Sequence, residues 1–232
     1  MEIVFQFILV AGVLKYSSKA TFFDGYRGIW HYSLIGGAIA MASYPIILHT
    51  DSDFFDKLMS DKGSVSNIVV VITIEAIVGM FISIGMLHNL FAAKTNKWIS
   101  VLKLIPGVLI IGIVFYTELM LFRAMAGVSF HWIAITASIS VMLATALLSL
   151  MLKYVLPDIS TRYEMKFLLN LLLLILAILL NAGLADYNTG HYEANTDYTK
   201  LLVFGGVAIL GFISGWLLFK YKRIIYKILK LR

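Results

Sequence analysis

Long apolar stretches constrain the fold of this chain more than any other feature. Seven of them are predicted, at about residues 3–23, 29–49, 66–92, 99–126, 130–155, 165–184 and 201–219. A helix needs roughly 20 apolar residues to cross the hydrocarbon core of a bilayer, which is about 30 Å thick. Backbone polar groups at that depth must be bonded within the chain, which favours helices. The sequence therefore predicts an all-α integral membrane protein, a bundle of about seven transmembrane helices.

Composition agrees with this fold class and limits the domain organisation. Of the 232 residues, 60% are hydrophobic and only 14% are charged, whereas roughly a quarter are charged in soluble domains. The chain has no cysteine, which excludes disulfides and thiolate-bound metals. Glu2 stands where a signal peptide carries basic residues, so the first segment is expected to remain as a span. We predict a single transmembrane domain at 1–219 and a basic amphipathic cytoplasmic tail at 220–232.

The basic residues predict the orientation. Of the 19 lysines and arginines, 15 lie at 15–28, 93–103 and 153–166 and in the tail, on one predicted side. Cytoplasmic loops carry such an excess, so the N-terminus is expected outside and the C-terminus in the cytoplasm. The protein is predicted to be a multi-pass protein of the cell's inner (cytoplasmic) membrane. Since the charges serve membrane orientation, no nucleic-acid partner is expected.

Two isolated carboxylates mark the candidate site. Glu75 and Glu118 lie in the middle of the third and fourth segments, with no charged neighbour within four residues. A carboxylate at membrane depth is costly and is a functional-site hypothesis by default. On adjacent antiparallel helices both acids would lie at nearly the same depth, where they are predicted to share a proton or hold a cation. The alternative is that each acid is separately protonated or hydrogen-bonded and stabilises packing.

Polar residues on other segments complete the predicted ion or proton site. Tyr44, Thr136 and Ser140 are placed at a similar outer depth and are expected to line it. On the second segment, small residues at three- or four-residue spacing allow another helix to approach closely. These are Gly36, Ala40 and Ser43.

The sequence carries no common catalytic motif, so we expect no enzymatic activity. The leading interpretation is proton- or cation-linked transport or conduction of a small solute or ion, alone or as the membrane component of an uptake system. The alternative is a non-catalytic scaffold or accessory subunit of a larger energised membrane complex, for example one for metal or haem uptake. Expected partners are the lipid bilayer, other membrane subunits or a second copy of the chain.

Three regions are candidate partner-binding surfaces. One is the GxxxG of the last segment, formed by Gly211 and Gly215, a spacing that suits helix association. The second is the aromatic loop around Arg27. The third is the basic tail, with Lys220, Arg223 and Lys227 on one helical face, which also suits an anionic lipid surface.

No cofactor or metal site is predicted. Histidines near the segment ends leave a haem-binding alternative, whereas interfacial side chains are the ordinary interpretation; they are His31, His88, His49 and His131. The loop sequence DSDFFD begins like a calcium-binding loop. It lacks the glycine at position six and has Lys62 at position twelve, so the motif fails.

Overall fold

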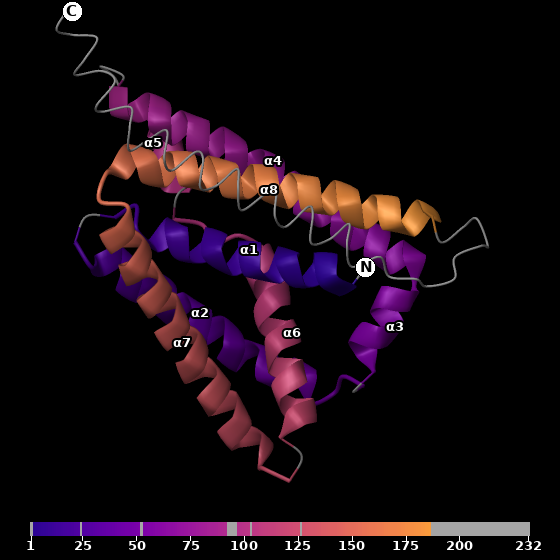
Figure 1. The fold of residues 1–232 in the computed structure, drawn as a ribbon. Helices are drawn as coiled ribbons and strands as arrows, with labels where there is room; N and C mark the ends of the chain where they lie inside the picture. The colour runs from indigo at the N-terminus through magenta and orange to yellow at the C-terminus, as the bar shows by residue number, and fades with distance from the viewer. Residues whose placement is uncertain are drawn as a thin grey trace, which may run out of the picture. The chain divides into compact units, whose positions relative to one another are not determined.

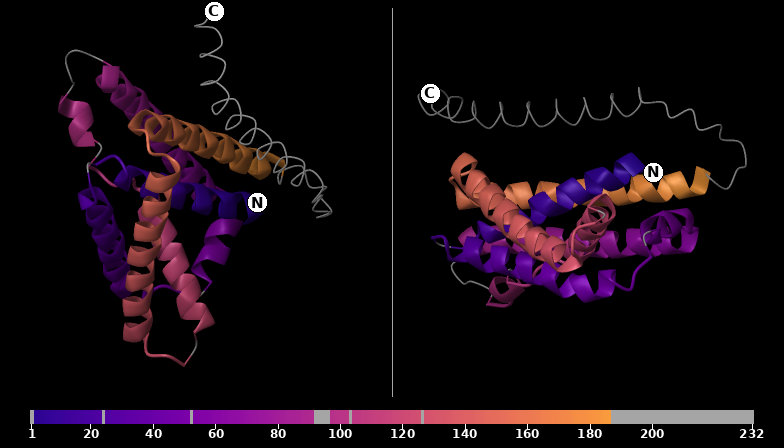
Figure 2. Two further views of the ribbon diagram at one scale, coloured as in Figure 1. Left: turned by 60° about the vertical axis from the view of Figure 1, so that its left-hand side comes forward. Right: turned by 90° about the horizontal axis from the view of Figure 1, so that it is seen from below.

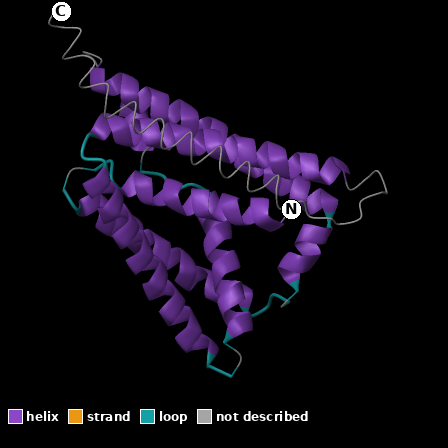
Figure 3. Ribbon diagram, in the orientation of Figure 1, coloured by secondary structure: helices purple, strands orange, loops and turns teal. Residues whose placement is uncertain are grey.

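The computed structural model describes residues 2–23, 25–51, 53–91, 97–102, 104–125 and 127–186. These residues contain helices and no strand (Figure 3). The helices are α1 (Glu2–Ala20), α2 (Arg27–Ile47), α3 (Phe54–Ser60), α4 (Lys62–Phe91), α5 (Lys97–Leu102), α6 (Leu109–Ala124), α7 (Phe130–Val155) and α8 (Ile159–Asp186). The chain divides into two compact units, Met1–Asn188 and Thr189–Arg232. The predicted seventh span and the basic tail lie outside the described residues.

Within the described residues, four helices are long and apolar enough to cross a membrane. Their apolar stretches are Ile3–Ala20 in α1, Lys62–Leu90 in α4, Phe130–Val155 in α7 and Ile159–Gly183 in α8. These helices indicate a membrane protein, and the predicted all-α class is confirmed.

The fourth predicted segment, 99–126, is not one continuous helix. It consists of α5 and α6, which are separated at residues 103–108. Pro106 lies in this gap; it has no backbone N–H and disfavours a helical conformation in the residue before it. The remaining α6 has 16 residues. At 1.5 Å per residue it is about 24 Å long, which is short for a full span.

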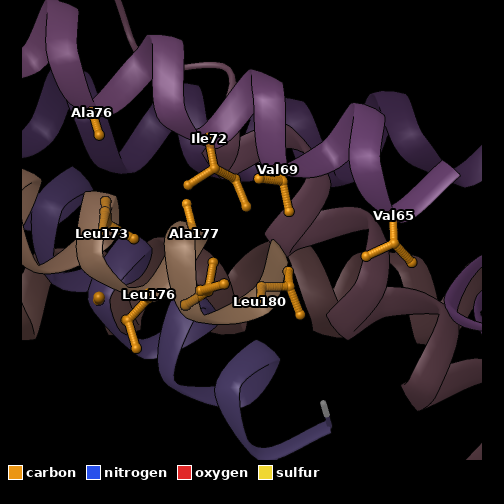
Figure 4. Close-up of a cluster of buried hydrophobic side chains, with 10 residues drawn as sticks. Val65, Val69, Ile72, Ala76, Leu173, Leu176, Ala177 and Leu180 are labelled. Carbon is orange, nitrogen blue, oxygen red and sulfur yellow. The ribbon is translucent and has the colours of Figure 1, made fainter. Parts of the chain in front are cut away.

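Helices α1, α4 and α8 pack around a common apolar core. Helix α4 lies along α8, and α1 contacts α8 from the other side (Figures 1 and 2). The core between them includes Val65, Ile72 and Ala76 of α4 and Leu173 and Ala177 of α8 (Figure 4). The small side chains of the two alanines allow these helices to approach closely.

Helix α2 packs mainly on α7, and α6 contacts both of them (Figure 1). The predicted small-residue face of α2 is buried, with Gly36, Ala40 and Ser43 all shielded. Next to it, Ser138 of α7 donates a hydrogen bond to the carbonyl of Gly37 at 2.9 Å. A side chain at Gly37 would collide with Met142, so the close approach requires glycine.

The surface and interior have the polarity expected in a bilayer. Large apolar side chains of α4 point outward, among them Ile74, Phe81 and Ile84. Charged and amide side chains point inward, including Lys166 and Asn170 of α8, which are fully buried. Soluble proteins rarely bury such groups.

Basic side chains bind loop groups at both ends of the helices. At one end, Lys153 donates to the carbonyl of Gly25 at 2.5 Å, and Arg162 donates to the carbonyl of Thr21. At the other end, Arg123 in the last turn of α6 contacts Asp56 of α3 and Asp53 just before it. It lies 3.1 Å from Asp56 and 3.5 Å from Asp53.

Candidate functional site

A buried ion pair lies against the gap between α5 and α6. Lys15 Nζ of α1 donates to Glu75 Oε1 of α4 at 2.8 Å, and the two side chains are only 7% and 15% exposed. The second carboxylate oxygen, Oε2, accepts the backbone N–H of Leu109 at 2.6 Å. Glu75 therefore connects α1, α4 and the first residue of α6.

Glu75 performs the role of a helix cap for α6. The first N–H groups of a helix have no partner within it, and they favour negative charge. Val108, which precedes α6, makes no side-chain capping bond. The carboxylate of Glu75 supplies the acceptor from another helix instead.

Lys19 binds the other side of the same gap. Its Nζ donates to the carbonyl of Ile105. In a continuous helix this carbonyl would accept the N–H of Leu109, four residues later. That single hydrogen bond is thus replaced by two charge-assisted ones, from Lys19 to the carbonyl and from the amide to Glu75.

Gly107 allows the carboxylate to come this close to the backbone. A Cβ atom at this position would collide with Glu75 Oε1. Any larger residue would have to displace the carboxylate from the start of α6.

A cavity of about 390 Å³ opens beside the gap. Its polar lining consists of Lys15, Lys19 and Glu75. Pro106 and Gly107 also face it, and most of the remaining wall is apolar. The cavity combines two cations, one anion and the interrupted backbone in a space large enough for a small solute.

A third buried lysine, Lys166, lies near Lys15 and Lys19. Lys166 is 0% exposed, and its Nζ has no hydrogen-bond partner among the described residues. It lies over the ring of Phe22, 5.0 Å from the centroid, and it experiences the like charges of Lys19 and Lys15. We call Lys15, Lys19 and Lys166 the basic cluster; Glu75 is the acid paired with it.

Asn170 lies one helical turn after Lys166 and is also 0% exposed. Its Nδ2 donates to the carbonyl of Lys166 at 2.8 Å, while its Oδ1 has no partner among the described residues. A Cβ atom at Gly79 of α4 would collide with this amide, so glycine permits the contact between α4 and α8.

The structure places the two predicted acids in different cavities. Glu118 lines a separate cavity of about 210 Å³, together with Ser140. The carboxylate of Glu75 lies at the start of α6, and Glu118 follows Leu109 by nine residues, about 14 Å along the helix. The matching depth was counted in residues from the outer ends of the two segments, and that count does not record that the carboxylate of Glu75 reaches the first residue of α6.

The other predicted lining residues lie apart from Glu118. The hydroxyl of Tyr44 is 3.4 Å from Nε2 of His131, an exposed contact between the end of α2 and the start of α7. Thr136 donates to the carbonyl of Trp132 in its own helix at 2.7 Å. Of the three, only Ser140 shares a cavity with an acid.

The remaining predicted residues lie on the surface or beyond the described residues. The four histidine side chains are exposed: His31, His49, His88 and His131. A ring nitrogen of His49 lies 2.9 Å from the carbonyl of Pro45 in its own helix. Arg27 is exposed at the start of α2. Five candidate partner-binding residues fall outside the described residues: Gly211, Gly215, Lys220, Arg223 and Lys227.

The sequence interpretation missed the basic cluster. In the sequence, Lys15 and Lys19 count only among the basic residues that predict the orientation. Their spacing of four residues was the available signal, because it places both on one face of a helix. Their partner groups on α4 and at the gap are distant in sequence, so the spacing alone did not identify them.

The acids in and next to α3 are engaged with cations. Lys57 Nζ lies 2.8 Å from Asp51 Oδ2, and this hydrogen bond and charge hold the pKa of Asp51 below its usual value. Arg123 contacts Asp53 and Asp56. Within the described residues no group of three metal-binding side chains occurs.

No family model, curated protein or solved structure matches this chain.

Proposed function

We propose that this protein carries a small anion across the membrane together with a proton, through the gap between α5 and α6. The observation that supports this proposal is the replaced hydrogen bond between Ile105 and Leu109. Its carbonyl is bound by Lys19 and its amide by Glu75, inside an apolar helix bundle. Interrupted membrane helices that expose backbone groups in a cavity are typical of transporter binding sites.

Glu75 occupies the place that a transported anion would take. The start of a helix is a ready anion site, because its N–H groups and dipole favour negative charge. While Glu75 is ionised, its carboxylate holds Lys15 and the amide of Leu109. Protonation removes that charge and releases both donors, so an anion can bind in its place. Anion binding and proton binding are thereby coupled.

The basic cluster favours an anion over the cation expected from the sequence. Two lysines, Lys15 and Lys19, line the cavity beside one acid, Glu75, which leaves an excess of positive charge when all three are ionised. A cation site would need the two acids together, whereas Glu118 faces a different cavity.

The proposed architecture keeps seven spans, with the N-terminus outside and the C-terminus in the cytoplasm. Two observations support it. Lys153 of α7 and Arg162 of α8 donate to the carbonyls of Gly25 and Thr21, between α1 and α2, at the end predicted to be cytoplasmic. Arg123 and the acids of α3 meet at the opposite end, which is predicted to be outside. The inner membrane remains the proposed location.

Transport by purified protein in proteoliposomes tests the function. Inward gradients of nitrate, sulfate, phosphate and chloride are applied singly, a trapped pH dye reports proton entry, and protein-free liposomes are the blank. The intact protein should acidify the lumen with at least one of these anions. Glu75→Gln resembles the protonated state, so it should move the same anion without acidifying the lumen.

Glu164→Gln is the matched control, because Glu164 is exposed on α8. It should behave as the unmodified protein does. Proton entry by Glu75→Gln at the unmodified rate would contradict the role of Glu75. No flux with any of the four anions would favour the scaffold alternative.

A further inference from the structure

Glu118 is a buried acid that the proposed transport path does not use. It is 1% exposed, and neither carboxylate oxygen has a hydrogen-bond partner among the described residues. Buried carboxyl groups are costly unless they are paired or hydrogen-bonded. Each such group in a native structure therefore requires an explanation.

The cavity of about 210 Å³ beside Glu118 explains why a carboxylate can lie there. Its wall comes from α1, α2, α6 and α7, and among the described residues that line it Glu118 alone is charged. Most of the wall is apolar, with side chains such as Val114, Leu121 and Val141. The hydroxyl of Thr117 already donates to the carbonyl of Ile113 at 2.8 Å.

We propose that this cavity binds a small organic ammonium compound, with the ammonium group on Glu118 and an apolar body against the wall. An ammonium group supplies the donors and the positive charge that the two carboxylate oxygens lack. A metal cation would need several oxygen ligands, whereas this wall offers one carboxylate and mainly carbon atoms.

The cavity volume sets the size of the ligand. A cavity of about 150 Å³ holds benzene in another protein, so 210 Å³ accommodates one ring or a short alkyl chain with an amine. The cavity is bordered by Ser140 and Ala144 of α7, both of which are exposed on the helix surface. An apolar amine dissolved in the bilayer can therefore enter from the side.

This site is separate from the proposed transport site. No residue lines both the 210 Å³ cavity and the 390 Å³ cavity. Changes at Glu118 should therefore leave proton entry in the proteoliposome assay unaffected, so the two proposals can fail independently.

The test is titration calorimetry of the full-length protein in detergent with cyclohexylamine, benzylamine and butylamine, with empty micelles as the blank. Saturable binding of at least one amine is expected. Cyclohexanol has a similar body without the charge, and it should bind at least tenfold more weakly than cyclohexylamine. Glu118→Gln should weaken amine binding at least tenfold, because the neutral amide no longer pairs with the ammonium group.

Two further variants make the result decisive. Ala144→Leu fills the mouth of the cavity while leaving Glu118 in place, and it should also weaken binding at least tenfold. Glu164→Gln should bind as the unmodified protein does. Absence of saturable binding for all three amines, or unmodified affinity in both Glu118→Gln and Ala144→Leu, would overturn the proposal. If Glu118→Gln does not fold, as judged by thermal unfolding, Ala144→Leu decides alone.

Discussion

At the scale of single residues, the ion pair of Lys15 and Glu75 is the most sensitive point of the described structure. Both side chains are largely shielded from solvent, and Glu75 also holds the amide of Leu109. Breaking a buried pair by removing one partner leaves an uncompensated charge in a poorly polar environment. The pair therefore stabilises the fold only while both partners are present.

Lys15→Met should lower the free energy of unfolding by about 3–5 kcal/mol, because it leaves the charge of Glu75 buried. Adding Glu75→Gln removes that charge, so the double variant should regain part of the loss. Unfolding by sodium dodecyl sulfate in mixed micelles measures both values. Losses that simply add in the double variant would show that the two residues do not act as a pair.

Residue-level prediction from the sequence identified the unusual groups but not their partners. Glu75 and Glu118 stand out as acids in apolar segments. That Glu75 faces Lys15, rather than Glu118, depends on the packing of α1 against the gap, which no local pattern records. Thr145, which also lines the cavity of Glu118, was overlooked, because isolated hydroxyls are common in membrane helices.

At the scale of helices, the contrast between Pro45 and Pro106 shows why the gap escaped prediction. Pro45 lies inside α2, which continues to Ile47, whereas Pro106 lies between two separate helices. The same residue type thus has two outcomes. At Pro106, Lys19 and Glu75 bind the backbone groups that the gap releases, so tertiary contacts decide whether the helix ends.

Gly79 should be intolerant of substitution, because a Cβ atom there would collide with the buried amide of Asn170. Gly79→Ala should destabilise the packing of α4 on α8 by about 1–3 kcal/mol. Gly112 of α6 is the matched control, since nothing lies within 4 Å of its added Cβ. Gly112→Ala should leave stability unchanged or raise it by up to about 1 kcal/mol. Equal effects of the two changes on unfolding in mixed micelles would contradict the contact.

The stability of the first turn of α4 should depend on pH, because Asp61 caps this turn. Asp61 Oδ2 accepts Ser64 Oγ at 2.5 Å and Ser64 N–H at 2.9 Å, and these bonds hold the pKa of Asp61 below its ordinary 3.8. A lowered pKa in the folded state contributes stability that is fully present above 3.8. That stability is lost as the pH falls through the lower, folded value.

Hydrogen exchange of the first turn of α4, measured from pH 6 to pH 2.5, tests this cap. Protection in the unmodified protein should fall at the acidic end. Asp61→Asn keeps an oxygen acceptor that does not titrate, so its protection should vary less with pH. Asp61→Ala should reduce protection throughout the range. The same acidic fall in Asp61→Asn and in the unmodified protein would exclude Asp61 as its cause.

At the scale of the whole molecule, apolar length predicts the fold class, whereas the basic residues predict the orientation in the membrane. Apolar length correctly predicted the all-α class, since α1, α4, α7 and α8 each have an apolar stretch of membrane length. It did not predict the short helices α3 and α5, because these lie at the borders of the apolar segments. The orientation depends on the membrane and on the machinery that inserts the chain, so it stays a prediction from the basic residues.

Single-cysteine labelling tests this orientation directly, because the chain contains no cysteine of its own. Ser60 of α3 and Asp158 before α8 are both exposed, at the ends predicted to be outside and inside. In intact cells whose outer barrier is permeable, a maleimide that cannot cross the inner membrane should label Ser60→Cys and leave Asp158→Cys unlabelled. After the membrane is dissolved, both should react.

The reverse pattern would invert the topology and place the acids of α3 in the cytoplasm. Labelling of both positions in intact cells would contradict the proposed number of spans between them, because an odd number of crossings must separate residues on opposite sides.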